Sequence, residues 1–90
     1  MKVGKGPSSG ARKQETLVAE MKSALARSLR KRRAGRKLSQ KVLAARLGSS
    51  QSRVSKIEAD DPEVSLDLLV RALIAIGSSR REIGRTLGGG

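Results

Sequence analysis

Four side chains that can donate hydrogen bonds lie within six residues of one another: Gln51, Ser52, Ser55 and Lys56. An amide, two hydroxyls and an ammonium can recognise a polar surface, and none of them is acidic. The apolar residues among them, Val54 and Ile57, are three apart, which is the spacing of one face of an α-helix. The pattern therefore predicts a helix that is anchored on its apolar face and carries out hydrogen-bonded recognition on the other.

A second short helix is expected just before this one. A serine hydroxyl can accept a bond from an orphan backbone N–H, so Ser39 is a good N-cap. The residues after it are apolar at helical spacing: Leu43, Ala44 and Leu47. Gly48 can end the helix, because glycine adopts a left-handed C-terminal conformation without steric cost. With Ser49 or Ser50 capping the next helix, residues 38–58 should form two short helices joined by a tight turn.

Three further helices are expected around this pair. The first, residues 12–33, carries apolar residues every fourth position: Leu17, Met21, Leu25 and Leu29. The fourth helix follows a Ser65 cap, ends at Gly77, and has an unbroken apolar face: Leu66, Leu69, Val70, Leu73 and Ile74. Ser79 and Glu82 form a capping box for a fifth helix that reaches about Leu87. The predicted fold is all-α, a compact bundle of about five helices.

The predicted domain spans residues 12–87. Residues 1–11 contain Gly, Ser and Pro with two lysines, which predicts a flexible basic arm, and residues 88–90 form a flexible glycine tail. Whether the arm is a disordered leader or lies along a charged partner is left open. No apolar run approaches the ~20 residues that span a bilayer, and no signal peptide is evident, so we expect a cytoplasmic protein with no membrane partner.

The composition argues against catalysis. The chain has no Cys and no His, so it lacks thiolate nucleophiles, thiolate metal ligands and histidine bases. Half of the eight carboxylates fall in one loop-like cluster: Glu58, Asp60, Asp61 and Glu63. A solvated turn is the favoured explanation of that cluster, and a carboxylate-only metal site is the less favoured one. We predict a protein that is not an enzyme and needs no cofactor and no metal.

The net charge of +12 is concentrated in the first part of the chain. Residues 1–37 hold twelve Lys or Arg against two Glu, which accounts for +10 of the total. The densest stretch is Arg27, Arg30, Lys31, Arg32, Arg33, Arg36 and Lys37. A solvated helix face is the alternative, but no acidic residue adjoins this run to neutralise it. So large an excess on a small domain indicates a polyanionic partner, nucleic acid before membrane.

The stretch Leu38–Glu58, LSQKVLAARLGSSQSRVSKIE, resembles the helix-turn-helix of the phage-repressor and Cro-like (XRE) family of DNA-binding domains. The pattern L-S-Q-x-x-L-A-x-x-L-G-x-S-x-S-x-V-S-x-I-E is present at every position. The resemblance implies a lambda-repressor-like fold whose third helix enters the major groove of double-stranded DNA. It also implies an ion pair between Arg33, late in the first helix, and Glu58.

Two sets of residues are expected to contact DNA. Gln51, Ser52, Ser55 and Lys56 are the outward positions of the recognition helix, and we expect them to read bases. Gln51 is the first candidate, with a solvated polar residue as the alternative. The expected phosphate contacts are Arg36, Lys37, Gln40, Lys41, Ser50 and Arg53. Gln40 joins that set because it matches a phosphate-binding position of the family.

Three functions are compatible with these features. The first is a bacterial or phage transcriptional regulator that binds operator DNA as a homodimer. The second is an antitoxin with a toxin protein as partner, because residues 65–73 are similar to those of HigA-type antitoxins. The third is a basic structural protein of a nucleoid or ribosome, which the helix-turn-helix disfavours. For the dimer interface, the fifth helix with Ile83 and Leu87 is the first candidate, and the apolar face of the first helix is the second.

Overall fold

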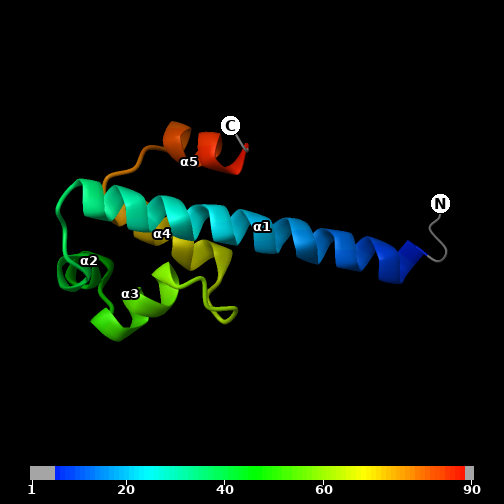
Figure 1. Cartoon of the computed structure of the whole chain (residues 1–90), viewed down its shortest axis with the longest axis horizontal. Helices are drawn as coiled ribbons and strands as arrows, with labels where there is room; N and C mark the ends of the chain where they lie inside the picture. Colours follow the sequence, from blue (N-terminus) through cyan, green and yellow to red (C-terminus); the bar gives the residue numbers. More distant parts are fainter. Residues whose placement is uncertain (1–5, 89–90) are drawn as a thin grey trace.

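The computed structural model describes residues 6–88, with side chains from Lys13 onward. Five helices and no strand are found in this part of the chain. They are α1 (Gly6–Gly35), α2 (Gln40–Leu47), α3 (Gln51–Glu58), α4 (Leu66–Ala75) and α5 (Arg80–Leu87). In Figure 1, α5 lies on one side of α1, and α2, α3 and α4 lie on the other. The predicted all-α bundle with a central helix-turn-helix is confirmed.

Four of the helices begin at a serine that caps them: Ser39, Ser50, Ser65 and Ser79. Each hydroxyl accepts the backbone N–H of the residue three positions later, which satisfies one orphan donor of the first turn. Ser50 rather than Ser49 caps α3. Gly48 ends α2 at φ +68°, in the left-handed region where a side chain would be strained.

The core lies where the C-terminal half of α1 meets α2, α3 and α4. Its largest fully buried side chains are Leu25, Leu29, Leu43, Val54, Ile57, Leu69, Leu73 and Ile76. Burial of one such side chain stabilises the fold by about 1.5–3 kcal/mol. Ile83 joins the core from α5, and Leu87 is partly buried against it. All five helices therefore contribute to a single core made of aliphatic side chains.

The first helix differs from its predicted bounds. It begins at Gly6, so residues 6–11 of the expected arm are helical, while residues 1–5 and the tail residues 89 and 90 lie outside the described residues. Pro7 is compatible with this start, because the first turn of a helix has no intrahelical use for its backbone N–H groups. Elongation of an existing helix also costs little per residue. As a result, α1 extends well beyond the other helices (Figure 1).

The apolar faces expected on the first and fourth helices are only partly buried. Leu17 and Met21 are 47% and 36% exposed, because no other helix reaches the N-terminal half of α1. Ile74 is 58% exposed, since Leu73 and Ile76 occupy the core positions at the end of α4. The interpretation of the fourth-helix face as core is therefore wrong at Ile74, whereas Leu17 and Met21 were expected only to share one face of the first helix. Periodicity identified an apolar face in each case but not what covers it.

Candidate nucleic-acid interface

The third helix separates its apolar and polar side chains on opposite faces. Val54 and Ile57 are fully buried and hold α3 against the core. The other face is exposed and carries no acidic group: Gln51, Ser52, Arg53, Ser55 and Lys56. The structure therefore brings together the four residues expected to read bases, on the outer surface of one helix.

The turn between α2 and α3 fixes the angle at which the second helix leaves the first. Ala44 is buried at the contact, where its small side chain allows close approach. After the left-handed Gly48, the Ser49 N–H donates back to the Ala44 carbonyl at 2.8 Å, a bond typical of a helix C-cap. The polar face of α3 is thus presented by a short and well-bonded turn.

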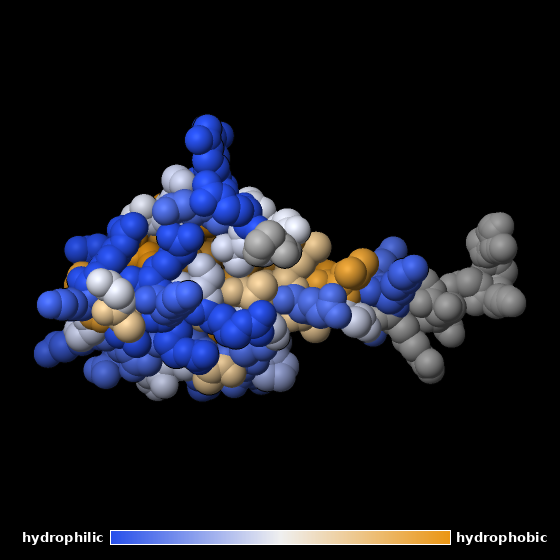
Figure 2. Space-filling view, turned by 45° about the horizontal axis from the view of Figure 1, so that its top comes forward, coloured by the Kyte–Doolittle hydropathy of each residue, from blue (hydrophilic) through white to orange (hydrophobic). Residues whose placement is uncertain are grey.

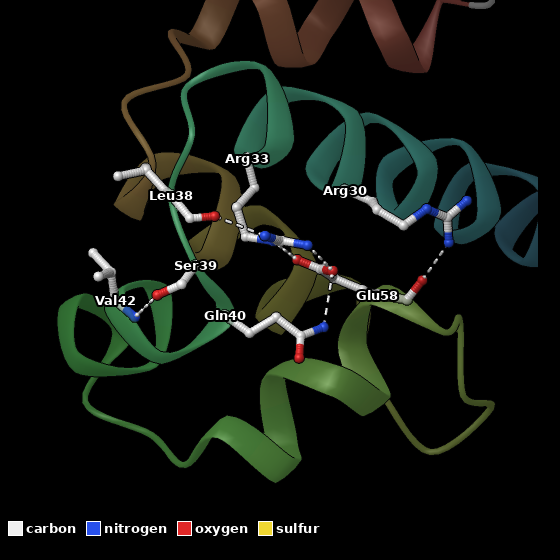
Figure 3. Close-up of polar contacts among 7 residues, drawn as sticks. All are labelled: Arg30, Arg33, Leu38, Ser39, Gln40, Val42 and Glu58. Atoms are coloured by element: carbon white, nitrogen blue, oxygen red, sulfur yellow. Dashed lines mark hydrogen bonds and ion pairs between the residues drawn. The ribbon is translucent and has the colours of Figure 1, made fainter.

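A buried ion pair joins α1 to the end of α3 (Figure 3). Arg33 donates from Nε to one oxygen of Glu58, and from Nη2 to the other at 2.9 Å. The Glu58 side chain is only 4% exposed, so its charge depends on this bidentate partner. The hydrogen bond to Glu58, and the attraction of its charge, raise the pKa of Arg33 although burial acts in the opposite direction. The pair is the one that the family resemblance implied.

Two further side chains complete this junction (Figure 3). Gln40, the first residue of α2, donates from Nε2 to Glu58 Oε1 at 3.2 Å. Arg30 donates to the Glu58 backbone carbonyl at 3.1 Å. Arg33 also donates to the Leu38 carbonyl at 2.7 Å. The start of α2 and the end of α3 are therefore held against α1 by one connected set of hydrogen bonds.

The residues expected to bind phosphate fall into two groups. Lys41, Ser50 and Arg53 are exposed on the helix-turn-helix, and Gln40 is half-buried at the start of α2. Arg36 is instead turned toward α4, where its Nη1 donates to the carbonyl of Ile76. It caps a helix C-terminus, and Gly77 at φ +93° leaves room for it, since a Cβ there would lie 2.5 Å from Nη1. Lys37 is exposed and adopts a left-handed φ of 59°.

The basic run of α1 is partly neutralised inside the protein, contrary to the expectation that nothing acidic stands nearby. Arg33 pairs with Glu58, and Arg32 pairs with Glu82 at 3.0 Å. These acids lie 25 and 50 residues further along the chain, so they are not visible from the local sequence. The run therefore contributes to the stability of the bundle as well as to its positive charge.

A shallow groove runs beside the exposed face of α3. One wall holds the polar and basic side chains of the α2–α3 turn and α3, and the other holds the loop before α4: Ser49, Ser50, Ser52, Arg53, Lys56, Asp61, Glu63, Val64 and Leu68. The groove thus has a basic wall and a wall with two carboxylates. Any anion that binds α3 is favoured at the basic wall and disfavoured at the loop.

The loop after α3 is fixed by contacts that the sequence did not reveal. Ser23 donates to the carboxylate of Asp60, a residue held at a left-handed φ of 59°. Lys22 donates to the carbonyl of Pro62 at 3.2 Å. Because the partners are about 40 residues apart in the chain, local patterns carry no signal for them.

Neither a metal site nor a membrane-spanning helix is found among the described residues. Among residues 6–88, no group of three or more potential ligands is placed to hold a metal ion. In the same range, no helix has the length and apolar character required to cross a membrane.

Comparison with known proteins gives one result. A family model described as Helix-turn-helix matches residues 29–83, which is 55 of the 90 residues. The match covers the last turns of α1 and continues into α5, but it leaves out the projecting part of α1. No curated protein and no solved structure matches the chain.

Proposed function

The chain belongs to the XRE-type helix-turn-helix family of DNA-binding domains, and from this premise we propose that it is a transcriptional repressor that binds a specific operator as a homodimer. The observation that supports this most directly is the two-faced α3, with Val54 and Ile57 buried and a polar, non-acidic face exposed. A second helix of this kind places its N-terminal residues at base edges in the major groove. The protein acts by binding, not by catalysis.

Base recognition is assigned to the exposed face of α3. Gln51 is its first residue and can bond N6 and N7 of adenine together. Lys56, more than one turn later, can donate to O6 and N7 of guanine. Ser52 and Ser55 lie on the same exposed face and accept or donate to several bases, so they add little discrimination. Gln51 is therefore the residue that should dominate specificity.

Phosphate binding is assigned to Lys37, Gln40, Lys41, Ser50 and Arg53. Lys41 and Arg53 supply charge, and the N-terminal turn of α2, where Gln40 stands, favours an anion. The Ser50 hydroxyl accepts the Arg53 N–H, and its own proton is available to a phosphate oxygen. Arg36 is exposed and stays in this set, although its Nη1 donates to the Ile76 carbonyl at the end of α4. These contacts fix the position of α3 on the duplex rather than its sequence preference.

The decisive experiment is selection of bound duplexes from a random pool, followed by affinity measurements on the selected site. We expect Gln51→Ala to relax the preference at one position in each half-site, with a loss of about 1–3 kcal/mol on the best sequence. Arg53→Ala should weaken all sequences alike and lower the slope of log K against log salt by about 1. Arg81→Ala, an exposed arginine on α5, is the matched control and should change neither.

Two results would count against the proposal. Equal affinity for random and selected duplexes would indicate a structural nucleic-acid protein instead of a regulator. Unchanged preference in Gln51→Ala would show that base reading lies elsewhere. The antitoxin alternative shares the same DNA interface, so DNA binding does not separate it from a repressor. Toxicity of a co-transcribed neighbouring reading frame, relieved by this protein, would establish that role.

A further inference from the structure

A group of exposed apolar side chains lies on the projecting part of α1. Five large hydrophobic residues are substantially exposed: Leu17, Val18, Met21, Val42 and Ile74. Three of these are on one stretch of α1, and Figure 2 shows apolar, orange-coloured atoms along the helix where it leaves the body. The other two are single residues on α2 and α4, which is normal for a protein surface.

We propose that this surface, formed by Leu17, Val18 and Met21, binds the same surface of a second copy of the chain, with the two α1 helices antiparallel and crossing near Val18. The proposal deepens the proposed function and rests on it, because it names the interface of the repressor homodimer. The α1 surface replaces α5 as the first candidate for the dimer interface. Ile83 is buried and Leu87 is partly buried within the protomer, so α5 has little apolar surface left for a partner.

Charge identifies the occupant as a second copy of this chain. The protein carries +12, so two copies repel each other over most of their surfaces. The described surface stretch from Lys13 to Lys22 has two lysines and two glutamates and is neutral. A DNA-binding surface would be basic, and a surface for an acidic protein would be too. A neutral apolar stretch on a strongly basic protein is suited to self-association.

Charge also selects the direction of the pairing. The seven-cation stretch of residues 27–37 follows this surface on the same helix. A parallel pairing would place two such stretches side by side, whereas an antiparallel pairing places them at opposite ends of the dimer. Their separation then exceeds the Debye length of ~8–10 Å, so salt screens their repulsion. A shallow groove along the helix supports a close crossing, since the small Ala19 lies between Glu15 and Lys22 in its lining. Antiparallel crossing sets each Glu15 toward the partner's Lys22, whose ammonium also donates to the Pro62 carbonyl of its own protomer.

The same arrangement directs both recognition helices to one side. Arg30 and Arg33, which hold the end of α3, lie on average about a quarter turn around α1 from Val18, at 100° per residue. A two-fold axis through the crossing therefore leaves both α3 helices on the same face of the pair. Arg30 is about 12 residues from Val18, or about 18 Å along α1, so the two points at which α1 holds the end of α3 lie roughly 36 Å apart along the helix direction, on the scale of one turn of duplex.

The interface lies outside the part of the chain that the family shares. The family match begins at residue 29, whereas the proposed surface ends at Met21. Substitutions in this surface are therefore expected to leave the folded domain and its DNA-reading helix intact. This separation makes the proposal testable without unfolding the protein.

The first test measures the mass of the full chain over a range of concentrations by sedimentation equilibrium. We expect a dimer, and we expect Val18→Glu to raise its dissociation constant roughly 30-fold or more, as for a central apolar contact. Ile74→Glu is the matched control, because Ile74 is also apolar and exposed, and it should leave the dimer unchanged. Unchanged helicity and melting temperature by circular dichroism would show that both variants are folded.

Two further variants test the register. Glu15→Lys should weaken the dimer, and the exchanged pair Glu15→Lys with Lys22→Glu should restore it. Because the chain has no cysteine, Val18→Cys should form a disulfide-linked dimer under mild oxidation, whereas Ala45→Cys on α2 should not. Failure of the exchange to restore the dimer, or equal cross-linking of both cysteine variants, would overturn the antiparallel crossing.

The outcomes separate this proposal from the proposed function. A wild-type protein that stays monomeric, or a dimer that Val18→Glu does not weaken, would overturn the α1 interface. Selection of a specific duplex by such a protein would leave the repressor proposal standing. A dimer that depends on Val18 but binds all duplexes with equal affinity would support the α1 interface and overturn the repressor proposal.

Discussion

Removal of Arg33 tests how strongly the first helix holds the recognition helix. In Arg33→Met, the Glu58 carboxylate stays buried at 4% exposure and loses both of its guanidinium hydrogen bonds. The Leu38 carbonyl loses its donor as well. Breaking a buried ion pair from one side costs about 3–5 kcal/mol, because an uncompensated charge remains. This is a large part of the roughly 5–15 kcal/mol that stabilises a typical domain.

The assay is thermal and urea unfolding followed by circular dichroism. A loss of about 3 kcal/mol corresponds to a fall in melting temperature of roughly 12–24 °C, at about 4–8 °C per kcal/mol for a domain of this size. Arg33→Lys keeps the charge without the two-pronged geometry and should recover only part of the loss. Arg71→Ala is the control, because its pair with Asp67 is about 70% exposed on both sides and is worth about 0–1 kcal/mol.

The double variant Arg33→Met with Glu58→Met decides whether the two residues act as a pair. Once both charges are absent, no uncompensated buried charge remains, so the double variant should be more stable than either single one. Strictly additive losses would refute the reasoning, since they would mean that Glu58 does not depend on Arg33. Equal losses in Arg33→Met and Arg71→Ala would refute it as well.

Two other predictions concern the same scaffold. Gly77→Ala should destabilise the protein by about 1–2 kcal/mol in urea unfolding, because φ +93° strains any side chain and the added Cβ would meet Arg36. Gly35→Ala is the control: the space around Gly35 is open, so this substitution should be neutral or slightly stabilising. The bond from the Ser79 N–H, followed by that from Arg32, lowers the pKa of Glu82, so this group stabilises the fold above its unfolded value of about 4.3 and the effect is lost as pH falls through the lowered folded pKa. Wild type should therefore exceed Glu82→Gln in stability at pH 6 and lose that advantage progressively as the pH falls below the unfolded pKa of Glu82, whereas a constant difference would contradict the assignment.

Local chemistry made much of this fold predictable from sequence. A serine before an apolar helical repeat predicts a cap, and the structure places a cap at Ser39, Ser65 and Ser79. Gly48 and the spacing of Val54 and Ile57 likewise predict the turn and the buried face of α3. These features depend on residues within one or two turns of each other, which is the range over which sequence patterns carry structural information.

The features that were missed depend on distant partners. The Leu17–Met21 stretch has the periodicity of a core face, but the other helices of the bundle end before they reach it, so it stays partly exposed. The hydrogen bond from Arg36 to the Ile76 carbonyl was not foreseen, because the two residues are forty positions apart in the sequence. The ion pair of Arg33 was implied by the family resemblance, and no local pattern would have shown it.

These internal partners change how the net charge should be understood. Of the seven cations in residues 27–37, four donate hydrogen bonds within the protein: Arg30, Arg32, Arg33 and Arg36. The other cations assigned to phosphate contacts are Lys37, Lys41 and Arg53, all of which are exposed. About three charges per protomer and six per dimer would give a slope of log K against log salt near −5, since each phosphate neutralised contributes about −0.9. A slope near −10 would show that the α1 run also lies on the phosphates, and that its internal hydrogen bonds are exchanged when DNA binds.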